Sequence, residues 1–283
     1  PALLSCYLIW GSTYLAIRHA LESIPPFLQM GTRFLAAGLL LMAWTRWRAR
    51  AGDAPPARLS LREWRNALLV GTLMLGGGMG LTASAGQFVA SGLVAAFIAV
   101  VPLLVCGWGL LAGRRPTRRE LLGMLTGLAG VLLLARGAGF AAAPEGLACL
   151  AGATIAWSLG SVLSMTRLPL APGARGFASE MLCGGAVLIA ISLALGEQVQ
   201  GPVTTRALLA WAYLVVFGSL IAFSAYLYLL AHASAAVATS YAFVNPVIAL
   251  LLGTWLASET VTAAEWIACG VILLGVFLIA SAK

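Results

Sequence analysis

The chain has 283 residues and a formal net charge of +8; 61% of its residues are hydrophobic and only 9% are charged. An ordinary soluble domain has about a quarter of its residues charged, so this chain has too few charges to cover a soluble core. The composition excludes an ordinary soluble domain and predicts an all-α polytopic membrane protein.

A helix needs about 20 apolar residues to cross a bilayer, and this rule divides the chain into ten predicted spans. Those of the first half are residues 2–20, 27–47, 64–84, 88–112 and 120–136. Those of the second half are residues 145–166, 173–195, 207–231, 235–258 and 265–282. The first apolar run has no small-x-small cleavage site, so we expect a retained helix and not a signal peptide.

Most of the 17 lysines and arginines fall in loops on one side of the predicted spans. They cluster between the second and third spans, from Arg46 to Arg65, and between the fourth and fifth spans, from Arg114 to Arg119. The positive-inside rule places these loops and both termini in the cytoplasm. The positive charge therefore follows from topology, and since no soluble domain presents these arginines we expect no nucleic-acid partner.

The two halves of the chain repeat one pattern, in which an apolar span is broken by a proline, Pro102 in the first half and Pro246 in the second. Five spans in each half is an odd number, so the second copy must enter the membrane from the opposite side. We therefore predict two inverted five-helix repeats, residues 1–137 and 143–283. A substrate site is expected where the two repeats meet.

Several stretches resemble the drug/metabolite transporter superfamily, specifically its ten-helix members with paired EamA-type repeats. The resemblance covers essentially the whole chain and rests on the order and twofold recurrence of short motifs. These motifs are IWGSTY in the first span, Arg33-Phe34, SGLVAAFIAVVPLL, ATSYAFVNPVIALLLGTWLASET, and the pairs Gly130-Val131 and Gly275-Val276.

This resemblance implies a multi-pass carrier of the bacterial inner membrane with a central cavity between its halves. Members often export amino acids, and the branch that exports aromatic or hydrophobic amino acids is one that the chain resembles. The chain departs from the family at Gly113-Arg114-Arg115, where a Gly-Glu pair is common. Any role of that glutamate in the first repeat cannot be carried over.

The first and sixth spans carry matching aromatic and polar residues near mid-membrane, Trp10, Ser12 and Tyr14 in one and Trp157 and Ser161 in the other. Polar side chains that face lipid are costly and usually turn inward, and tryptophan otherwise prefers the membrane interface. We expect these five residues to bind substrate. Serine at such positions also suits close helix packing, which is the alternative reading.

The ninth span carries Thr239, Tyr241 and Asn245 directly before Pro246. Proline lacks an N–H and frees the carbonyl four residues earlier, so we predict a kink at Pro246 with an unpaired carbonyl. Asn245, a neighbouring helix or a substrate ammonium could pair with that carbonyl. We expect the three polar residues to bind substrate, whereas Pro102 has apolar neighbours and is expected to act as a hinge.

Tyr226 and Tyr228 lie near the middle of the eighth span. They point about 200° apart on a helix of 3.6 residues per turn, so we expect only one of them to line the cavity. We favour Tyr226.

Arg33 and Glu180 are ionisable residues inside the matching second and seventh spans. Ionisable residues within a membrane are functional candidates by default. Arg33 could hold a substrate carboxylate, and Glu180 could carry a coupling proton. The alternative is structural, since either side chain could reach the nearby interface and Glu180 could pair with Arg175 or His232.

The leading hypothesis is a secondary carrier that exports small amphipathic metabolites by alternating access, foremost amino acids with aromatic or apolar side chains. A membrane channel, or a broad drug/metabolite carrier with a non-amino-acid substrate, stays open as an alternative. We expect no enzyme and no catalytic residues, because most acids lie in loops or at span ends. The cysteines are scattered singly and the two histidines are isolated, so no cofactor or metal site is predicted. We expect a monomer or a homodimer in the lipid bilayer.

Overall fold

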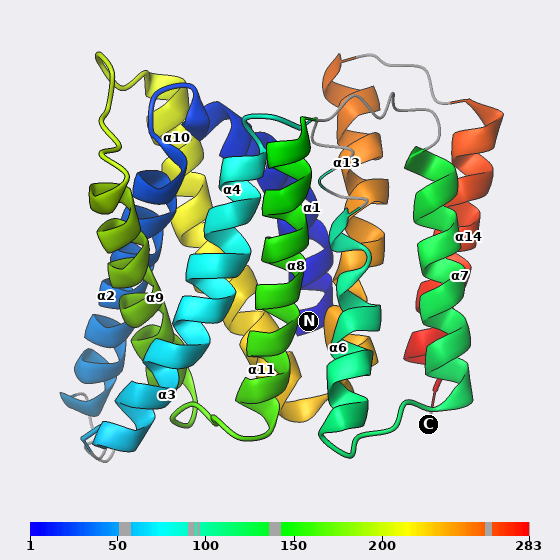
Figure 1. The fold of residues 1–283 in the computed structure, drawn as a ribbon, viewed down its shortest axis with the longest axis horizontal. Coiled ribbons are helices and arrows are strands. Elements are labelled where there is room, and N and C mark those ends of the chain that lie inside the picture. Colours follow the sequence, from blue (N-terminus) through cyan, green and yellow to red (C-terminus); the bar gives the residue numbers. More distant parts are fainter. Residues whose placement is uncertain (51–57, 90–93, 95–96, 136–142, 258–261, 283) are drawn as a thin grey trace.

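The computed structural model describes residues 1–50, 58–89, 94, 97–135, 143–257 and 262–282, and every regular element within them is a helix. Figure 1 shows these helices as one bundle. In chain order they are α1 (Ala2–Leu21), α2 (Pro26–Arg50), α3 (Leu61–Gly71), η1 (Thr72–Gly80), α4 (Leu81–Ala85), α6 (Val101–Leu111), α7 (Arg118–Ala135), α8 (Pro144–Met165), α9 (Ala174–Ala194), α10 (Thr205–Tyr213), η2 (Leu214–Phe223), α11 (Ser224–His232), α12 (Ala235–Thr239), α13 (Tyr241–Ala257) and α14 (Ala263–Ala280).

The all-helical membrane class predicted from composition is confirmed in the described residues. Within the described residues, seven helices or continuous helix runs are long and apolar enough to cross a membrane: 26–48, 61–85, 144–165, 174–194, 205–232, 235–252 and 263–280. The count of ten spans stays a prediction. Parts of the predicted spans 88–112, 120–136 and 235–258, the link 137–142 and the loop residues 258–261 lie outside the described residues.

Two of the helix runs contain a π-helical middle, and these runs are the third of each predicted repeat. In the first, η1 joins α3 to α4, and in the second, η2 joins α10 to α11. Figure 1 shows α3 low and α4 high, whereas α10 is high and α11 is low. The two runs therefore cross the bundle in opposite directions, as inverted repeats require.

Helices α2 and α9 pack closely through glycines. A Cβ placed on Gly38 would meet Leu182 and the carbonyl of Ala178, and a Cβ on Gly185 would meet Leu35 and the carbonyl of Gly31. Adding 147 to 31, 35 and 38 gives 178, 182 and 185, so the two sets of contacts are copies of each other. The α2–α9 pair thus lies across a pseudo-twofold axis.

Helices α7 and α14 form an equivalent pair, seen together at one edge of the bundle in Figure 1. A Cβ on Gly130 would meet Ile272 and the carbonyl of Ala268, and a Cβ on Gly275 would meet the backbone of Gly127 and Gly123. The glycines of α7 therefore pack inside the protomer, where they allow two backbones to approach.

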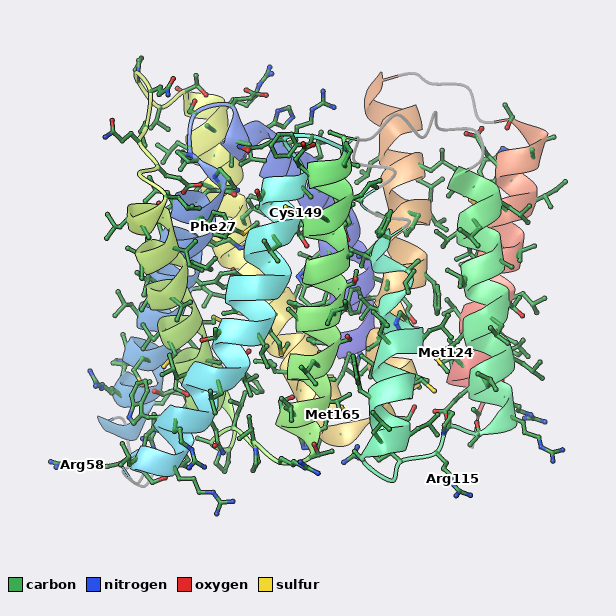
Figure 2. The ribbon with its side chains drawn as sticks, in the orientation of Figure 1. Phe27, Arg58, Arg115, Met124, Cys149 and Met165 are labelled. Carbon is green, nitrogen blue, oxygen red and sulfur yellow. The ribbon has the colours of Figure 1, made fainter. Side chains whose placement is uncertain are left out.

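The outer faces of the bundle carry large exposed apolar side chains, including Trp47, Leu111 and Phe277. Figure 2 places Arg58 and Arg115 at one end of the bundle, which we call the basic end, and we call the opposite end the far end. Apolar sides between polar ends are the arrangement that a bilayer requires.

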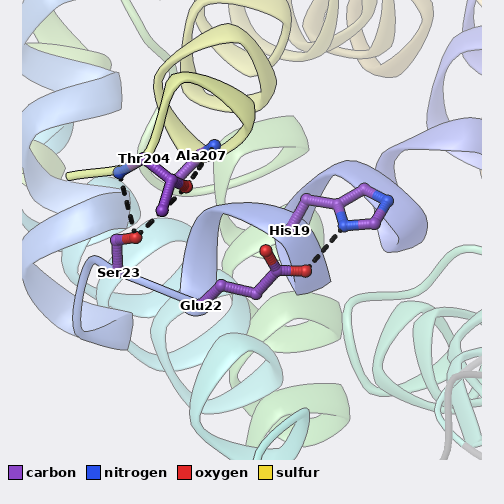
Figure 3. A network of polar contacts seen from close by, with 5 residues as sticks. All are labelled: His19, Glu22, Ser23, Thr204 and Ala207. Carbon is purple, nitrogen blue, oxygen red and sulfur yellow. Dashed lines mark hydrogen bonds and ion pairs between the residues drawn. The ribbon is translucent and has the colours of Figure 1, made fainter.

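At the far end the loop after α1 is tied to the start of α10 (Figure 3). Ser23 Oγ accepts from the backbone N–H of Thr204 at 3.3 Å, and Thr204 caps α10 by accepting from the N–H of Ala207. His19 and Glu22 are joined at 2.9 Å, and this hydrogen bond holds the pKa of Glu22 below its usual range. The bond between Ser23 and Thr204 connects the first repeat to the second outside the apolar layer.

Candidate functional site

A cavity lies near the centre of the bundle, between helices of both halves. Its volume is about 50 Å³, which is room for a few waters. Its walls come from α1, η1, α4, the chain up to the first turn of α6, α8 and α13. The lining residues are Trp10, Thr13, Tyr14, Ile17, Gly78, Met79, Thr82, Ile98, Val101, Ala153, Thr154, Trp157, Tyr241 and Asn245.

Four aromatic rings, Trp10, Trp157, Tyr226 and Tyr241, form one cluster beside this central cavity. The ring centroid of Trp10 is 5.7 Å from that of Trp157 and 4.5 Å from that of Tyr241, both edge to face. Tyr226 stacks on Trp157 at 5.3 Å and meets Tyr241 edge to face at 5.4 Å. Each such contact contributes about 0.5–1.5 kcal/mol of stability beyond burial, so the contacts hold the four rings in one arrangement.

The cluster is held by hydrogen bonds that cross between helices. Trp10 Nε1 donates to the carbonyl of Gly218 in η2 at 3.2 Å, and Tyr226 OH shares a bond of 2.9 Å with Ser161 Oγ. Asn245 Nδ2 donates to Tyr14 OH at 3.5 Å. Residues of α1, α8, η2, α11 and α13 are thereby fixed around one point.

Two polar atoms of lining residues have no partner among the described residues. Asn245 Oδ1 accepts no hydrogen bond, and Trp157 Nε1 makes none of good geometry, although the hydroxyls of Tyr226 and Tyr241 lie near it. Buried polar atoms are nearly always paired, and the exceptions call for water or a ligand. One acceptor and one donor are therefore available at the cavity wall.

The structure brings together five of the nine residues predicted to bind substrate: Trp10, Tyr14, Trp157, Tyr241 and Asn245 all line the central cavity. The other four do not line it. Two of these four, Tyr226 and Ser161, lie behind Trp157. Tyr228, which was not favoured as a binding residue, is half exposed on the outer face. Ser12 shares a hydrogen bond of 2.6 Å with Tyr213 OH, and Thr239 donates to the carbonyl of Ala235 within its own helix.

The contribution of the helix run α3–η1–α4 to the central cavity was not predicted from the sequence. Gly78 lies so close to Trp157 that a Cβ there would come within 2.9 Å of the indole ring, and Thr82 and Met79 also line the cavity. The run of glycines from Gly76 to Gly78 was the available signal, since it predicts close packing. The π-helical winding of η1 has no comparable sequence signature, although π-turns are frequent at functional sites.

Of the two prolines, one takes the expected place and the other does not. Pro102 was predicted to break the middle of a span, but it lies in the first turn of α6, where proline is tolerated because that N–H has no helical partner. Pro246 lies inside α13 as predicted. The chain also breaks earlier, at Ser240, where α12 ends and α13 begins.

Arg33 is completely buried and does not reach the membrane interface. Its Nε donates to Ser219 Oγ at 2.7 Å, its Nη1 lies 3.5 Å from Met30 Sδ, and its guanidinium sits 4.8 Å from the centre of the Phe34 ring. Nη2 has no partner among the described residues. Because Arg33 does not line the central cavity, a direct role in binding a carboxylate stays a prediction.

Glu180 is also completely buried, and neither of its carboxyl oxygens has a hydrogen-bond partner in the described part of the chain. The alternative that it reaches the interface or hydrogen-bonds to Arg175 or His232 is therefore wrong. His232 Nδ1 is instead paired with the carbonyl of Tyr228.

The central cavity continues toward the far end. A second cavity of about 330 Å³ shares Tyr14, Ile17 and Thr82 with it and extends past Leu21 and Phe88. A third cavity, of about 200 Å³, lies near Arg114 and Arg115 at the basic end. In α8, Trp157 lines the central cavity and Val162 lines the third cavity. Ser158 and Ser161 lie between these two residues along the helix, in the layer between the two cavities.

Three hydrogen bonds between helices lie in this separating layer. Besides Ser161 with Tyr226, Trp108 Nε1 donates to Ser158 Oγ at 3.0 Å, and Tyr7 OH shares a bond of 2.8 Å with Ser240 Oγ. The layer and the aromatic cluster lie between the central cavity and the third cavity. Among the described residues, no group of three or more His, Cys, Asp or Glu side chains could hold a metal ion.

Comparison with known proteins adds the family. The EamA-like transporter family matches residues 2–136 and 144–281. The chain is 42% identical over 283 residues to the uncharacterized inner membrane transporter YedA of Escherichia coli (strain K12), covering 100% of this chain and 90% of that protein. It is 27% identical over 283 residues to Protein PecM of Dickeya dadantii (strain 3937), covering 97% and 87%. One solved crystal structure matches with a TM-score of 0.78 at 25% identity, covering 99% of this chain and 95% of that chain.

Proposed function

Because the chain belongs to the EamA-like transporter family of the drug/metabolite transporter superfamily, we propose that it exports small amphipathic metabolites by alternating access. The protein is a membrane transporter of the inner membrane. The substrate class that we propose is amino acids, foremost those with aromatic or apolar side chains. The two inverted repeats would rock around the central cavity, with the basic end facing the cytoplasm.

The observation that carries this proposal is the composition of the cavity wall. Trp10, Trp157 and Tyr241 give it large apolar faces, while Asn245 Oδ1 and Trp157 Nε1 have no well-formed hydrogen bond to any described residue. Ligand sites combine an apolar wall with a few polar groups that fix orientation. An amphipathic solute, with a ring or aliphatic chain at one end and an ammonium group at the other, suits that combination.

The cavity is too small for a whole amino acid in this conformation, because it has room for only a few waters. Binding would have to widen it, which fits a carrier whose helices move. The π-helical runs η1 and η2 are candidate places for that movement, since Gly78 and Gly218 lie in them beside Trp157 and Trp10. A channel is disfavoured because the aromatic cluster and the layer of hydrogen bonds block the path toward the basic end.

The test is uptake of labelled phenylalanine, methionine and lysine into proteoliposomes that contain the purified protein. We expect saturable uptake of phenylalanine and methionine that exceeds uptake of lysine. Equal rates for all three would contradict the aromatic and apolar preference and favour a broad carrier. No uptake of any would favour a non-amino-acid substrate, and flux that does not saturate would favour a channel.

A further inference from the structure

Among the described residues, Glu180 is a buried acid that the transport path described above leaves unexplained, whereas the other buried acid, Glu120, accepts from the backbone N–H of Thr117. It lies on α9, is 0% exposed, and has both carboxyl oxygens without a hydrogen-bond partner in the described residues. An ionised carboxylate buried in that state is extremely unfavourable, and such a group gives up its charge by taking a proton. The closed conformation therefore favours the neutral acid.

Among the described residues, none of the groups that the structure places against the Glu180 carboxyl is a cation. At its level α2 contributes Gly38, where a Cβ would meet the backbone of Ala178 and Leu182, and α3 contributes Gly71, where a Cβ would meet the carbonyl of Glu180 itself. Among the described residues, the titratable side chains on which a charge at Glu180 acts electrostatically are Tyr226 on α11 and Cys183 on α9. A neutral phenol and a neutral thiol cannot stabilise a negative charge as an arginine would.

Tyr226 links Glu180 to the transport site. Its ring stacks on Trp157 and contacts Trp10 and Tyr241, and its hydroxyl is bonded to Ser161 in the layer that closes the cavity toward the basic end. A charge on Glu180 would be felt by this ring and by that hydrogen bond. The protonation state of Glu180 and the closure of the basic end are therefore physically connected.

The repeat symmetry allows Glu180 to be compared with Arg33. Arg33 and Glu180 lie 147 positions apart, the spacing that also relates Trp10 to Trp157, so they hold equivalent places in the two repeats. Arg33 keeps its charge with donors bonded to Ser219 and Met30, whereas Glu180 has no such partner. One half thus carries a fixed charge and the other carries a group that can gain and lose one.

We propose that Glu180 is a proton-binding site that couples solute transport to proton movement in the opposite direction. This proposal rests on the proposed transport function. When the bundle opens Glu180 to water on one side, the carboxylate takes a proton from water; the closed state holds the neutral acid; opening to the other side returns the proton to water. The step is a proton transfer only, so no electron moves and no co-reactant is needed.

The first test needs no transported substrate. Dicyclohexylcarbodiimide reacts with protonated carboxyl groups in apolar surroundings, and mass spectrometry locates the adduct. We expect the wild-type protein to be modified on the peptide that contains Glu180, with modification falling as pH rises. Glu180→Gln should lose this adduct and Glu145→Gln, which changes an exposed acid, should keep it. Absence of the adduct in the wild type, or modification that does not depend on pH, would overturn the site.

The second test measures coupling in proteoliposomes with labelled phenylalanine under an imposed pH gradient. If one proton exchanges per solute, a gradient of one pH unit can raise the accumulation ratio by at most about tenfold. We expect wild type and Glu145→Gln to respond to the gradient and Glu180→Gln not to respond. A wild-type protein that carries phenylalanine without any response to the gradient would overturn the coupling. If phenylalanine is not carried at all, the proposed substrate class fails, and carbodiimide modification still decides the site.

Discussion

Trp10 and Trp157 hold equivalent positions in the two repeats, 147 residues apart, and their rings meet edge to face with centroids 5.7 Å apart. Equivalent residues that touch each other must lie at the pseudo-twofold axis. The same spacing relates the contacts of Gly38 to those of Gly185 on the α2–α9 pair. The central cavity therefore lies at the pseudo-twofold axis between the two repeats, which is where an alternating-access carrier has its substrate site.

Trp157→Phe keeps an aromatic ring and removes the unpaired Nε1–H. If that donor binds the solute, one hydrogen bond is lost, which amounts to about 0.5–1.5 kcal/mol and about a 2- to 10-fold weaker apparent affinity for phenylalanine. The measurement is concentration-dependent uptake into proteoliposomes. Trp266→Phe, on the exposed face of α14, is the matched control and should transport normally. Equal affinities for the two variants would remove Trp157 from the binding site.

Asn245→Ala removes the unpaired Oδ1 and the hydrogen bond to Tyr14 OH. We expect uptake of labelled phenylalanine to weaken by about 2- to 10-fold, since a polar contact of the cavity is lost. Thr239→Ala, one and a half turns earlier, should have little effect because its hydroxyl is already bonded to Ala235. A larger loss for Thr239→Ala than for Asn245→Ala would restore Thr239 as a binding residue.

The sequence was sufficient for the fold class, and it also pointed to several residues that line the central cavity. Trp10, Trp157, Tyr241 and Asn245 could be found because aromatic and polar residues at mid-membrane depth are costly unless they face the interior. Ser12 could not be separated from them by composition. It is two residues from Trp10, so it points about 200° away and reaches Tyr213 instead of the cavity.

Other features depend on packing that no local pattern records. Pro102 was expected to break a span, yet whether a proline kinks a helix or begins one depends on where the preceding turn ends. In each of the π-helical runs η1 and η2 a glycine lies beside a tryptophan of the other repeat, Gly78 beside Trp157 and Gly218 beside Trp10. That Glu180 lacks a partner also depends on neighbours from α2, α3 and α11 that are distant in sequence.

Gly275→Ala tests the close packing of α7 on α14. The new methyl group would lie 2.5 Å from the backbone nitrogen of Gly127 and 2.7 Å from the carbonyl of Gly123, so backbone must shift. Overpacking of this kind costs about 1–3 kcal/mol, and we expect a lower unfolding temperature in detergent. Gly270→Ala makes the same change on the same helix where nothing lies within 4 Å, and it should be neutral or slightly stabilising. Equal unfolding temperatures would mean that the α7–α14 contact does not contribute to stability.

Thr82→Cys and Ser161→Cys test which end of the transport path is open, in a background where the five native cysteines are replaced. Thr82 lines both the central cavity and the cavity that leads to the far end, whereas Ser161 lies in the layer toward the basic end and is completely buried. The arginines place the basic end in the cytoplasm by the positive-inside rule, so the far end faces the periplasm.

A maleimide that cannot cross membranes should therefore modify Thr82→Cys when it is added to the periplasmic side of intact spheroplasts, and it should leave Ser161→Cys unmodified. Inverted vesicles expose the other side, and there neither cysteine should react in the resting protein. Modification of Ser161→Cys in inverted vesicles, together with protection of Thr82→Cys in spheroplasts, would mean that the resting protein is open at the basic end. That result would reverse the assignment of the Ser161–Tyr226 bond and the aromatic cluster as the closed side of the path.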